Sequence, residues 1–225
     1  MAINKNKFKE VTKLVIDNLE GGYFNPLWHN VKDTRYNTSG ETMFGIDRKN
    51  GGYLNTTPSG LKFWALIDKN KNQKVWKWNY TGGALNKELT DLTSEIIYPE
   101  FVKLENLYLK PKAIEIVNNN NKLLFNFIYA TWNGAGWFKK FATDLNEAIA
   151  KGETNTEKLI QVVLNSRLNE GLKKNSKPNS LIAQGGKKIA NLFKINLPLT
   201  EKKKIIPLLI TILTTIFLIH KYKKQ

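Results

Sequence analysis

Residues 123–150, LLFNFIYATWNGAGWFKKFATDLNEAIA, form a long apolar stretch whose composition and spacing predict α-helix. The run Asn133-Gly134-Ala135-Gly136 interrupts this stretch, because glycine is unfavourable inside a helix and typical of turns. We therefore predict two helices joined by a short break. A stretch of this length and type indicates a mainly helical domain.

Further helical patterns lie on both sides of this stretch. Residues 86–109 predict a helix with a break or kink near Pro99, and residues 111–117 predict a short helix that an asparagine run ends. Downstream, residues 156–172 form an amphipathic pattern with apolar side chains at helical spacing. These segments indicate a helical bundle that continues to about residue 172.

The N-terminal part combines one helix with a polar lobe. Apolar residues recur at helical spacing over residues 8–19, and two glycines follow directly, so we place Glu20 on the last turn of that helix. From residue 23 to about residue 58 the sequence is polar and rich in Gly, Asn and Thr, which predicts loops and short strands. Residues 61–78 fit a helix or a strand. The predicted fold class is α+β, mainly α, with a small early β/loop lobe beside the helical bundle.

The composition excludes several kinds of site. The chain has 225 residues, no cysteine and two histidines, His29 and His220. It therefore has no disulfide, no thiolate zinc site and no cysteine nucleophile, and it offers few imidazole ligands. We expect no metal site and no cofactor. With 41% hydrophobic residues and six tryptophans the chain can build a core, which excludes a fully disordered protein.

Positive charge is concentrated in the C-terminal part. The formal net charge is +16, and residues 171–225 contain twelve lysines but a single acidic residue, Glu201. Lysine clusters beside apolar sequence favour an anionic surface, such as lipid headgroups, wall polymers or nucleic acid. The chain has three arginines, and arginine makes the bidentate base contacts of direct readout, so we expect no specific nucleic-acid partner.

The uncharged run IIPLLITILTTIFLI at residues 205–219 predicts a membrane anchor. As a helix it is about 22 Å long, and snorkelling lysines on both sides extend it across a hydrocarbon core of roughly 30 Å. The alternative, a buried core helix, conflicts with the lysine clusters at both ends. We expect a domain in residues 1–172, a basic linker in 173–203, a transmembrane helix in 204–221 and a basic tail in 222–225.

Two further expectations concern the membrane. Residues 181–193, within the linker, predict a short amphipathic helix on a membrane surface. The N-terminus lacks the apolar segment of a signal peptide, and together with a C-terminal anchor this favours a viral protein. We expect it in a virion membrane or in the inner membrane of a bacterial host. The lysines on both sides of the anchor leave its orientation open.

Glu20 is the candidate catalytic acid. Cleavage of a glycosidic bond needs a carboxylic acid with a raised pKa, which protonates the leaving oxygen. An acid at a helix end, beside a polar lobe and before two small glycines, suits a cleft that admits a glycan chain. A glutamate at a helix end is also typical of a solvated surface, so its position alone does not identify a function.

The residues EGGYFN (20–25) and SGETMFGID (39–47) resemble the E-G-G-Y-x-N and G-G-x-T-x-x-G-I-T segments of the muramidases of glycoside hydrolase family 108. They are similar, more loosely, to the E-G and T-x-G arrangement of phage-type lysozymes. Residues 123–138 resemble the aromatic helical region of glycoside hydrolase family 108, in which a short N-x-G break interrupts the helix. The order of acid, Thr/Gly lobe and helical bundle matches over about residues 5–170. The resemblance implies a lysozyme-like fold and cleavage of peptidoglycan glycan strands.

The resemblance also implies roles for individual residues. Glu20 would be the general acid, and the Thr42 hydroxyl would help to hold a water or line the floor of the cleft. Gly40 and Gly45 would shape tight turns, where a positive φ is expected. Two features depart from the family pattern: residues 26–38 form a longer insert, and Asp47 stands where the family has threonine.

The identity of a second carboxylate stays open. Asp33, Glu41 and Asp47 are the candidates, and sequence separation cannot rank them because the distance in space decides the stereochemistry. Asp47 and Arg48 are also expected to form a local ion pair that holds the loop. A lytic transglycosylase needs a single acid/base, because the substrate's own hydroxyl closes the ring, and Glu20 alone would then suffice.

Candidate substrate contacts come from aromatic and amide side chains. Aromatic rings offer flat faces for stacking on sugars, the Asn133 amide suits an N-acetyl group, and His29 borders the polar lobe as a candidate acid/base partner. The alternative for each of these residues is a structural or surface role. The full set of candidates is Tyr23, His29, Tyr129, Trp132, Asn133 and Trp137.

We therefore predict a membrane-anchored muramidase or lytic transglycosylase, with bacterial peptidoglycan as one partner and a lipid membrane as the other through residues 204–221. Anchoring beside the wall polymer raises the local concentration of the enzyme. One alternative is a structural virion membrane protein that keeps a lysozyme-like fold without activity. The other is a membrane-bound nucleic-acid binder. Retention of Glu20 together with Thr42 argues against the first, and the lack of arginine in the tail argues against the second.

Overall fold

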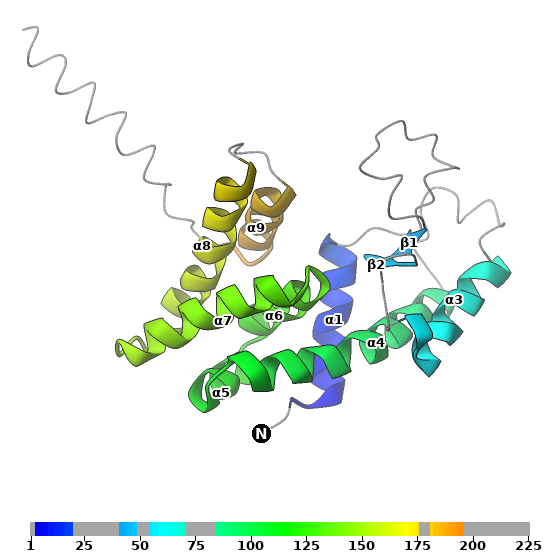
Figure 1. The fold of residues 1–225 in the computed structure, drawn as a ribbon, viewed down its shortest axis with the longest axis horizontal. Helices are drawn as coiled ribbons and strands as arrows, with labels where there is room; N and C mark the ends of the chain where they lie inside the picture. Colours follow the sequence, from blue (N-terminus) through cyan, green and yellow to red (C-terminus); the bar gives the residue numbers. More distant parts are fainter. Residues whose placement is uncertain (1–2, 20–40, 49–54, 71–83, 176–180, 196–225) are drawn as a thin grey trace, which may run out of the picture. The chain divides into compact units, whose positions relative to one another are not determined.

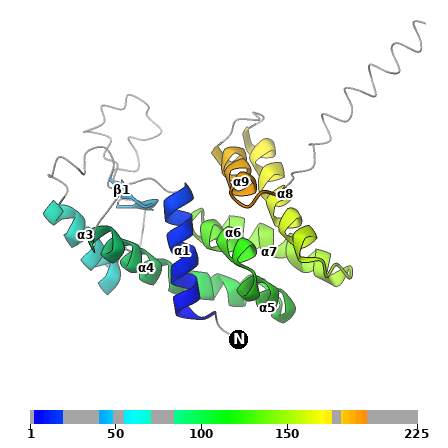
Figure 2. The ribbon, with the colours of Figure 1, turned by 180° about the vertical axis from the view of Figure 1, so that it is seen from behind.

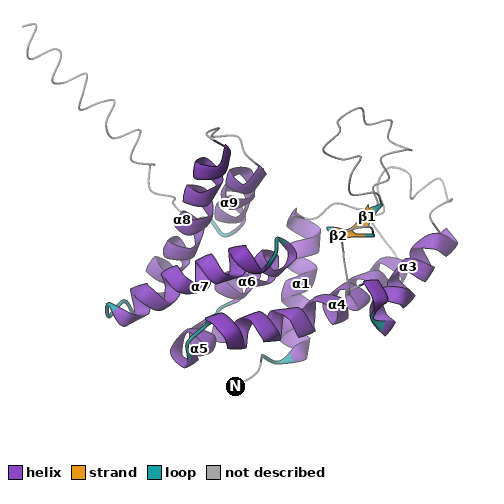
Figure 3. Cartoon of the chain, viewed as in Figure 1, coloured by secondary structure: helices purple, strands orange, loops and turns teal. Residues whose placement is uncertain are grey.

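The computed structural model describes residues 3–19, 41–48, 55–70, 84–175 and 181–195, and these are mainly helical with one small β-hairpin (Figures 1 and 3). The predicted class, α+β and mainly α, is confirmed at this level. In chain order the elements are α1 (Lys5–Leu19), β1 (Thr42–Met43), β2 (Ile46–Asp47), α3 (Pro58–Asn70), α4 (Ala84–Tyr108), α5 (Pro111–Asn119), α6 (Asn121–Trp132), α7 (Ala135–Ala150), α8 (Thr156–Asn175) and α9 (Leu181–Leu192).

Helix ends follow local signals in the sequence. The Asn120 side chain caps α6 by accepting hydrogen bonds from two backbone N–H groups of the first turn, each at 3.0 Å. The predicted break is confirmed, because α6 ends at Trp132 and α7 begins at Ala135. Gly134 lies between them with a φ of 100°, a conformation that favours glycine.

Helix α4 is continuous through Pro99, so of the predicted break or kink near this residue the break does not occur. Proline removes one backbone hydrogen bond from a helix. Helix α4 packs against α1, α3, α6 and α7, and it buries Ile96 and Ile97 before the proline and Phe101 and Leu104 after it. Tertiary packing on both sides of Pro99 therefore stabilises the helix across the missing bond.

Phenylalanine rings from four helices form the centre of the helical core. The ring centroid of Phe101 on α4 lies 5.0 Å from that of Phe8 on α1 and 5.8 Å from that of Phe138 on α7. Phe138 in turn lies 5.0 Å from Phe127 on α6. All four rings are fully buried, and tilted or edge-on contacts add to the stabilisation from burial. These contacts join α1, α4, α6 and α7 into one core.

A second group of buried side chains joins the β-hairpin to the helices. In the hairpin Thr42 pairs with Asp47, and Met43 pairs with Ile46. Because the apolar side chains of the hairpin pack in one buried cluster with side chains from three helices, the hairpin is part of the core of the fold. We call this group the hairpin cluster; it consists of Ile16 from α1, Met43, Phe44 and Ile46 from the hairpin, Phe63, Trp64 and Ile67 from α3, and Leu89, Leu92 and Ile96 from α4.

The compact part of the chain continues beyond the domain boundary that we expected at residue 172. The chain divides into two units, Met1–Phe193 and Lys194–Gln225, so α9 belongs to the first unit. Helix α9 packs against α8 and α1, and Figures 1 and 2 both show it beside α8. The stretch that we expected to be linker therefore contains a packed helix.

Gly186 permits the close approach of α9 to α8. A Cβ atom at this position would lie 3.1 Å from Cδ2 of Leu168. Ile189 is fully buried, and the Phe193 ring lies 5.1 Å from the Phe125 ring in an edge-on contact. Helix α9 is thus amphipathic, but these apolar side chains face the protein and are not available to a membrane.

The described part of the chain contains no helix that is long and apolar enough to cross a membrane. The anchor predicted in residues 204–221 and the tail in 222–225 lie outside the described residues.

Candidate functional site

Three segments that are far apart in the sequence meet at the hairpin cluster. Ile16, one turn before the end of α1, packs in this cluster with Met43, Phe44 and Ile46 of the hairpin. Trp132, the last residue of α6, is half-buried and packs against the same cluster. The end of α1, the hairpin and the end of α6 therefore lie close together, and each carries or precedes a candidate site residue.

Several candidates lie outside the described residues. These are the proposed acid Glu20, the aromatic and imidazole side chains of Tyr23 and His29, the carboxylate Asp33, and Gly40. Glu20 is the residue that follows Leu19, the last residue of α1. The described residues thus define the end of the helix that directly precedes Glu20, and the hairpin lies beside that end.

The hairpin turn has an unusual backbone. Phe44 has a φ of 51° and Gly45 a φ of 71°, which are the signs that a two-residue type I′ turn requires. The positive φ expected for Gly45 is confirmed. A phenylalanine in this conformation costs roughly 1–2 kcal/mol, and burial of its ring in the hairpin cluster offsets that cost. Strained residues of this kind are concentrated at functional sites, so the turn is consistent with a functional site in this lobe.

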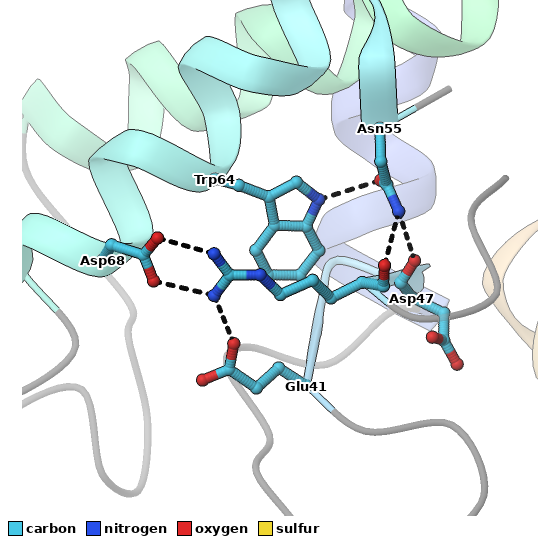
Figure 4. A network of polar contacts seen from close by, with 6 residues as sticks. Glu41, Asp47, Asn55, Trp64 and Asp68 are labelled. Atoms are coloured by element: carbon cyan, nitrogen blue, oxygen red, sulfur yellow. Dashed lines mark hydrogen bonds and ion pairs between the residues drawn. The ribbon is translucent and has the colours of Figure 1, made fainter. Parts of the chain in front are cut away.

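Arg48, directly after β2, fastens the hairpin to α3 (Figure 4). Its guanidinium donates two parallel hydrogen bonds to the Asp68 carboxylate, at 2.7 Å and 2.6 Å, and one to Glu41, at 2.5 Å. The bond to Asp68, with a contribution from Glu41, raises the pKa of the guanidinium above its usual value against an opposing effect of burial. Arg48 therefore stays charged and bridges two acids.

An aromatic ring and an amide complete this network. The Arg48 guanidinium lies 5.0 Å from the centre of the Trp64 ring, within the range of a cation–π contact. Trp64 Nε1 donates to Asn55 Oδ1 at 2.8 Å. Asn55 Nδ2 donates to the backbone carbonyls of Asp47, at 3.0 Å, and Arg48, at 2.8 Å. We call Glu41, Arg48, Asn55, Trp64 and Asp68 together the Arg48 clamp.

The alternation of side chains along the hairpin gives its two faces different roles. Met43 and Ile46 form one pair and are buried, whereas the neighbouring pair, Thr42 and Asp47, is half-buried. Arg48 N–H donates to the Glu41 carbonyl at 2.8 Å, so these two residues extend the ladder on the face of Met43 and Ile46. One face is therefore fixed to α3 by the clamp, and the opposite face presents Thr42 beside Asp47.

This division separates the candidate carboxylates. Glu41 lies on the clamped face in an ion pair with Arg48, which indicates a structural role for this carboxylate. The Asp47 side chain points away from the guanidinium in Figure 4, so the expected Asp47–Arg48 ion pair is replaced by the pairs of Arg48 with Glu41 and Asp68. Of the two described candidates, Asp47 is the one on the same face as Thr42.

The candidates near the helix break belong to two groups. Trp132 packs against the hairpin cluster, and its buried Nε1 has no hydrogen-bond acceptor among the described residues. Tyr129 and Trp137 instead lie near Phe141. The Arg167 guanidinium is 4.3 Å from the Tyr129 ring and 5.1 Å from the Phe141 ring, and the Trp137 ring is 5.9 Å from the Phe141 ring. Trp132 is the residue of this set that the described structure brings to the hairpin.

Asn133 has a local structural role at the end of α6. Its Nδ2 donates to the Tyr129 carbonyl at 2.6 Å, and this carbonyl also accepts the backbone N–H of Asn133 at 3.3 Å. The side chain is exposed. The amide donor that we expected to serve an N-acetyl group is thus engaged with the backbone of its own helix.

Asp68, Asn55 and Trp64 were not identified from the sequence as parts of the lobe. Trp64 and Asp68 are four residues apart, which places them on one face of α3 once residues 58–70 are known to be helical. Because the sequence of residues 61–78 fits either a helix or a strand, the four-residue spacing of Trp64 and Asp68 did not identify a shared face. Asn55, which precedes α3, carries no local signal that connects it to the hairpin.

Comparisons with protein-family models, with curated proteins and with solved structures found no match to this chain. Within the described ranges, no group of three or more His, Cys, Asp or Glu side chains could hold a metal ion. Function is therefore inferred from the motifs and from the geometry around the hairpin.

Proposed function

We propose that this protein cleaves the glycan strands of peptidoglycan, with Glu20 as the general acid. One observation supports the proposal above others: the helix that Glu20 follows packs, through Ile16, in the same cluster as the hairpin that carries Thr42. The two motifs on which the resemblance rests, EGGYFN and SGETMFGID, are thus continuous with elements that are neighbours in space.

In the proposed reaction the protonated Glu20 carboxyl gives its proton to the glycosidic oxygen. The bond between that oxygen and the sugar C1 breaks, and its electron pair stays with the leaving oxygen. The positive charge that develops at C1 needs a nearby carboxylate or a nucleophile. Asp47 and Thr42 pair on the face of the hairpin opposite the clamp, which suits a carboxylate and a hydroxyl that hold an attacking water.

The two proposed reactions differ in what attacks C1. In a muramidase, water adds to C1 and loses a proton to a carboxylate, either the second carboxylate or the deprotonated Glu20, and the product has a reducing end. In a lytic transglycosylase, the C6 hydroxyl of the same sugar adds to C1, returns its proton to Glu20 and forms an anhydro end. The second reaction needs no second carboxylate, so loss of clearing on replacement of Asp47 would favour the muramidase, and the products separate the two mechanisms directly.

The test is clearing of purified peptidoglycan sacculi by the full chain in mild detergent. We expect turbidity to fall with the wild-type chain and to stay constant with Glu20→Gln, because an amide cannot supply the proton. Glu10→Gln is the matched control, since Glu10 is an exposed glutamate on α1 and its replacement should leave clearing unchanged. Mass spectrometry of the fragments distinguishes reducing ends from anhydro ends.

Two results would overturn the proposal. One is clearing by Glu20→Gln at the wild-type rate. The other is the absence of clearing by a folded wild-type chain on sacculi of several wall chemistries, which would favour the structural virion membrane protein. Circular dichroism of each variant shows whether the helical fold is intact, so a folding defect is not mistaken for a loss of chemistry.

A further inference from the structure

The two sides of α9 differ in what they contact. Gly186, Ile189 and Ala190 are buried against the protein. Lys187, Lys188, Asn191 and Leu192 are exposed, and at 100° per residue they lie within an arc of about 140°. Leu192 is 38% exposed, which is high for a large apolar side chain. We call these four residues the outer face of α9.

No described acidic side chain forms an ion pair with the lysines of this outer face. Residues 171–200 contain six lysines and no acidic residue. In the part of the chain that the structure describes, neither Lys187 nor Lys188 forms an ion pair. Lysines on other helices do so, such as Lys87 with Asp91 on α4 and Lys112 with Glu115 on α5. Within the described residues, the outer face is therefore a cationic surface with one apolar side chain.

The chain that follows α9 indicates which anionic surface is near. Eleven residues separate Phe193 from Ile205, where the uncharged run begins, and a chain of this length spans at most about 40 Å. If the run crosses a bilayer, as its composition predicts, the first unit is tethered close to lipid headgroups. A basic helix directly before a membrane anchor is attracted to anionic lipids.

We infer that the outer face of α9 lies on an anionic lipid surface, with Lys187 and Lys188 at the headgroup phosphates and Leu192 in the interface. The apolar side of α9 is engaged with α8, so attraction to the membrane depends mainly on charge. This inference depends on the anchor in residues 204–221 and does not depend on glycan cleavage.

The absence of cysteine from the chain permits a direct test. The full chain with Asn191→Cys carries a bimane label and is reconstituted into phosphatidylcholine vesicles with or without phosphatidylglycerol. A lipid with a nitroxide on its headgroup quenches the label only when the outer face is at the surface. We expect strong quenching with phosphatidylglycerol, weak quenching without it, and reversal at high salt, because screening weakens the attraction. A label at Glu115→Cys on α5, an exposed control position, should be quenched weakly in both vesicles.

A pair of charge variants tests the lysines themselves. Lys187→Gln with Lys188→Gln should lower the ratio of docked to undocked chains about 25-fold, since each lysine near an anionic surface contributes roughly a factor of five. The control, Lys103→Gln with Lys112→Gln, removes the same charge from exposed sites on α4 and α5 and should change the ratio little.

Four results would overturn the inference. They are equal quenching with and without phosphatidylglycerol, an equal loss of quenching in both pairs of charge variants, failure of the chain to stay with either vesicle, and a response of the label to a soluble oligonucleotide or wall polymer but not to vesicles. The vesicles contain no glycan, so failure here is distinct from failure in the clearing assay.

Discussion

Arg48 and Asp68 form a two-bond pair across the lobe: the guanidinium after β2 donates to both carboxylate oxygens of an aspartate near the end of α3, at 2.7 Å and 2.6 Å. The residues are twenty positions apart in the chain. Among the described residues, no other ion pair joins the hairpin region to α3. The pair fixes the face of the hairpin that is opposite Thr42 and Asp47. The structure of the candidate site therefore depends on it.

Arg48→Lys should weaken the lobe. Lysine keeps the charge but cannot reproduce the planar, two-bond geometry or the contact with the Trp64 ring. Because 35% of the Arg48 side chain and 43% of the Asp68 side chain are exposed, solvent screening limits the loss to about 1 kcal/mol in the free energy of unfolding. Urea denaturation measures it. Lys112→Gln, at an exposed pair on α5, serves as the control and should change stability by less than about 0.5 kcal/mol. Equal stability of Arg48→Lys and wild type would show that the clamp has no energetic role.

Gly45→Ala should destabilise the hairpin turn. At a φ of 71° an alanine side chain is strained, and we expect a loss of about 1 kcal/mol in the free energy of unfolding. Gly152→Ala provides a matched control, since Gly152 has a φ of 89° after the end of α7 and open space around it. Both variants should lose similar stability in a thermal melt, whereas only Gly45→Ala should slow the clearing of sacculi. A similar effect of both variants on clearing would contradict a specific role of the hairpin.

Glu105 should make stability depend on pH. The side chain is 1% exposed on α4, its Oε1 has no hydrogen-bond partner among the described residues, and burial raises its pKa above the ordinary value of 4.5. A hydrogen bond with Asn118 opposes that shift. The folded state thus keeps the proton to higher pH than the unfolded state. The free energy of unfolding should therefore fall as the pH rises from about 4.5 through the raised pKa of the folded state.

Urea denaturation over a series of pH values tests this expectation. Glu105→Gln has no proton to lose, so that decrease should be absent, and stability at neutral pH should equal or exceed that of wild type. Glu115→Gln is the control, because Glu115 lies exposed on α5 and its replacement should leave the pH profile unchanged. A wild-type profile in Glu105→Gln would show that Glu105 does not cause the pH dependence.

Gly186→Val should loosen α9. Its Cβ would lie 3.1 Å from a methyl of Leu168, and the two further methyl groups would force the helices apart at a cost of about 1–3 kcal/mol. Hydrogen exchange should then show faster exchange in α9 with little change in α4. Gly136→Ala, in the first turn of α7, should leave exchange in α9 unchanged, because its added Cβ would meet no atom within 4 Å. Equal exchange of α9 in Gly186→Val and wild type would contradict the close packing of α9 on α8.

Local signals in the sequence predicted much of the helical framework. Periodic apolar residues predicted α1, α5 and α8, and the glycines after Trp132 predicted the separation of α6 from α7. Hydrogen bonds and side-chain contacts within a helix join residues three or four positions apart, so a short window contains the information that they need. The positive φ of Gly45 was accessible for the same reason, since it is a property of one residue and its turn.

The candidate site was only partly predictable. Thr42 and Asp47 were identified from their motif, but their shared face follows from the register of the hairpin, and the assignment of Glu41 to the clamp follows from contacts with Arg48. Asn133 was expected to bind a ligand through its amide, whereas this amide donates to the Tyr129 carbonyl of its own helix. Residue type alone does not reveal which partner a polar side chain selects.

The sequence by itself determined the helical character, the positions of the main helix ends, the absence of cysteine chemistry and the concentration of positive charge after residue 170. Only the tertiary structure decided that α4 continues through Pro99, that α9 turns its apolar side toward α8, and that Arg48 pairs with Asp68 rather than with its neighbour Asp47. The physical reason is the range of the interactions. Backbone periodicity acts over a few residues, whereas burial and ion pairing act between segments that meet only when the chain is folded.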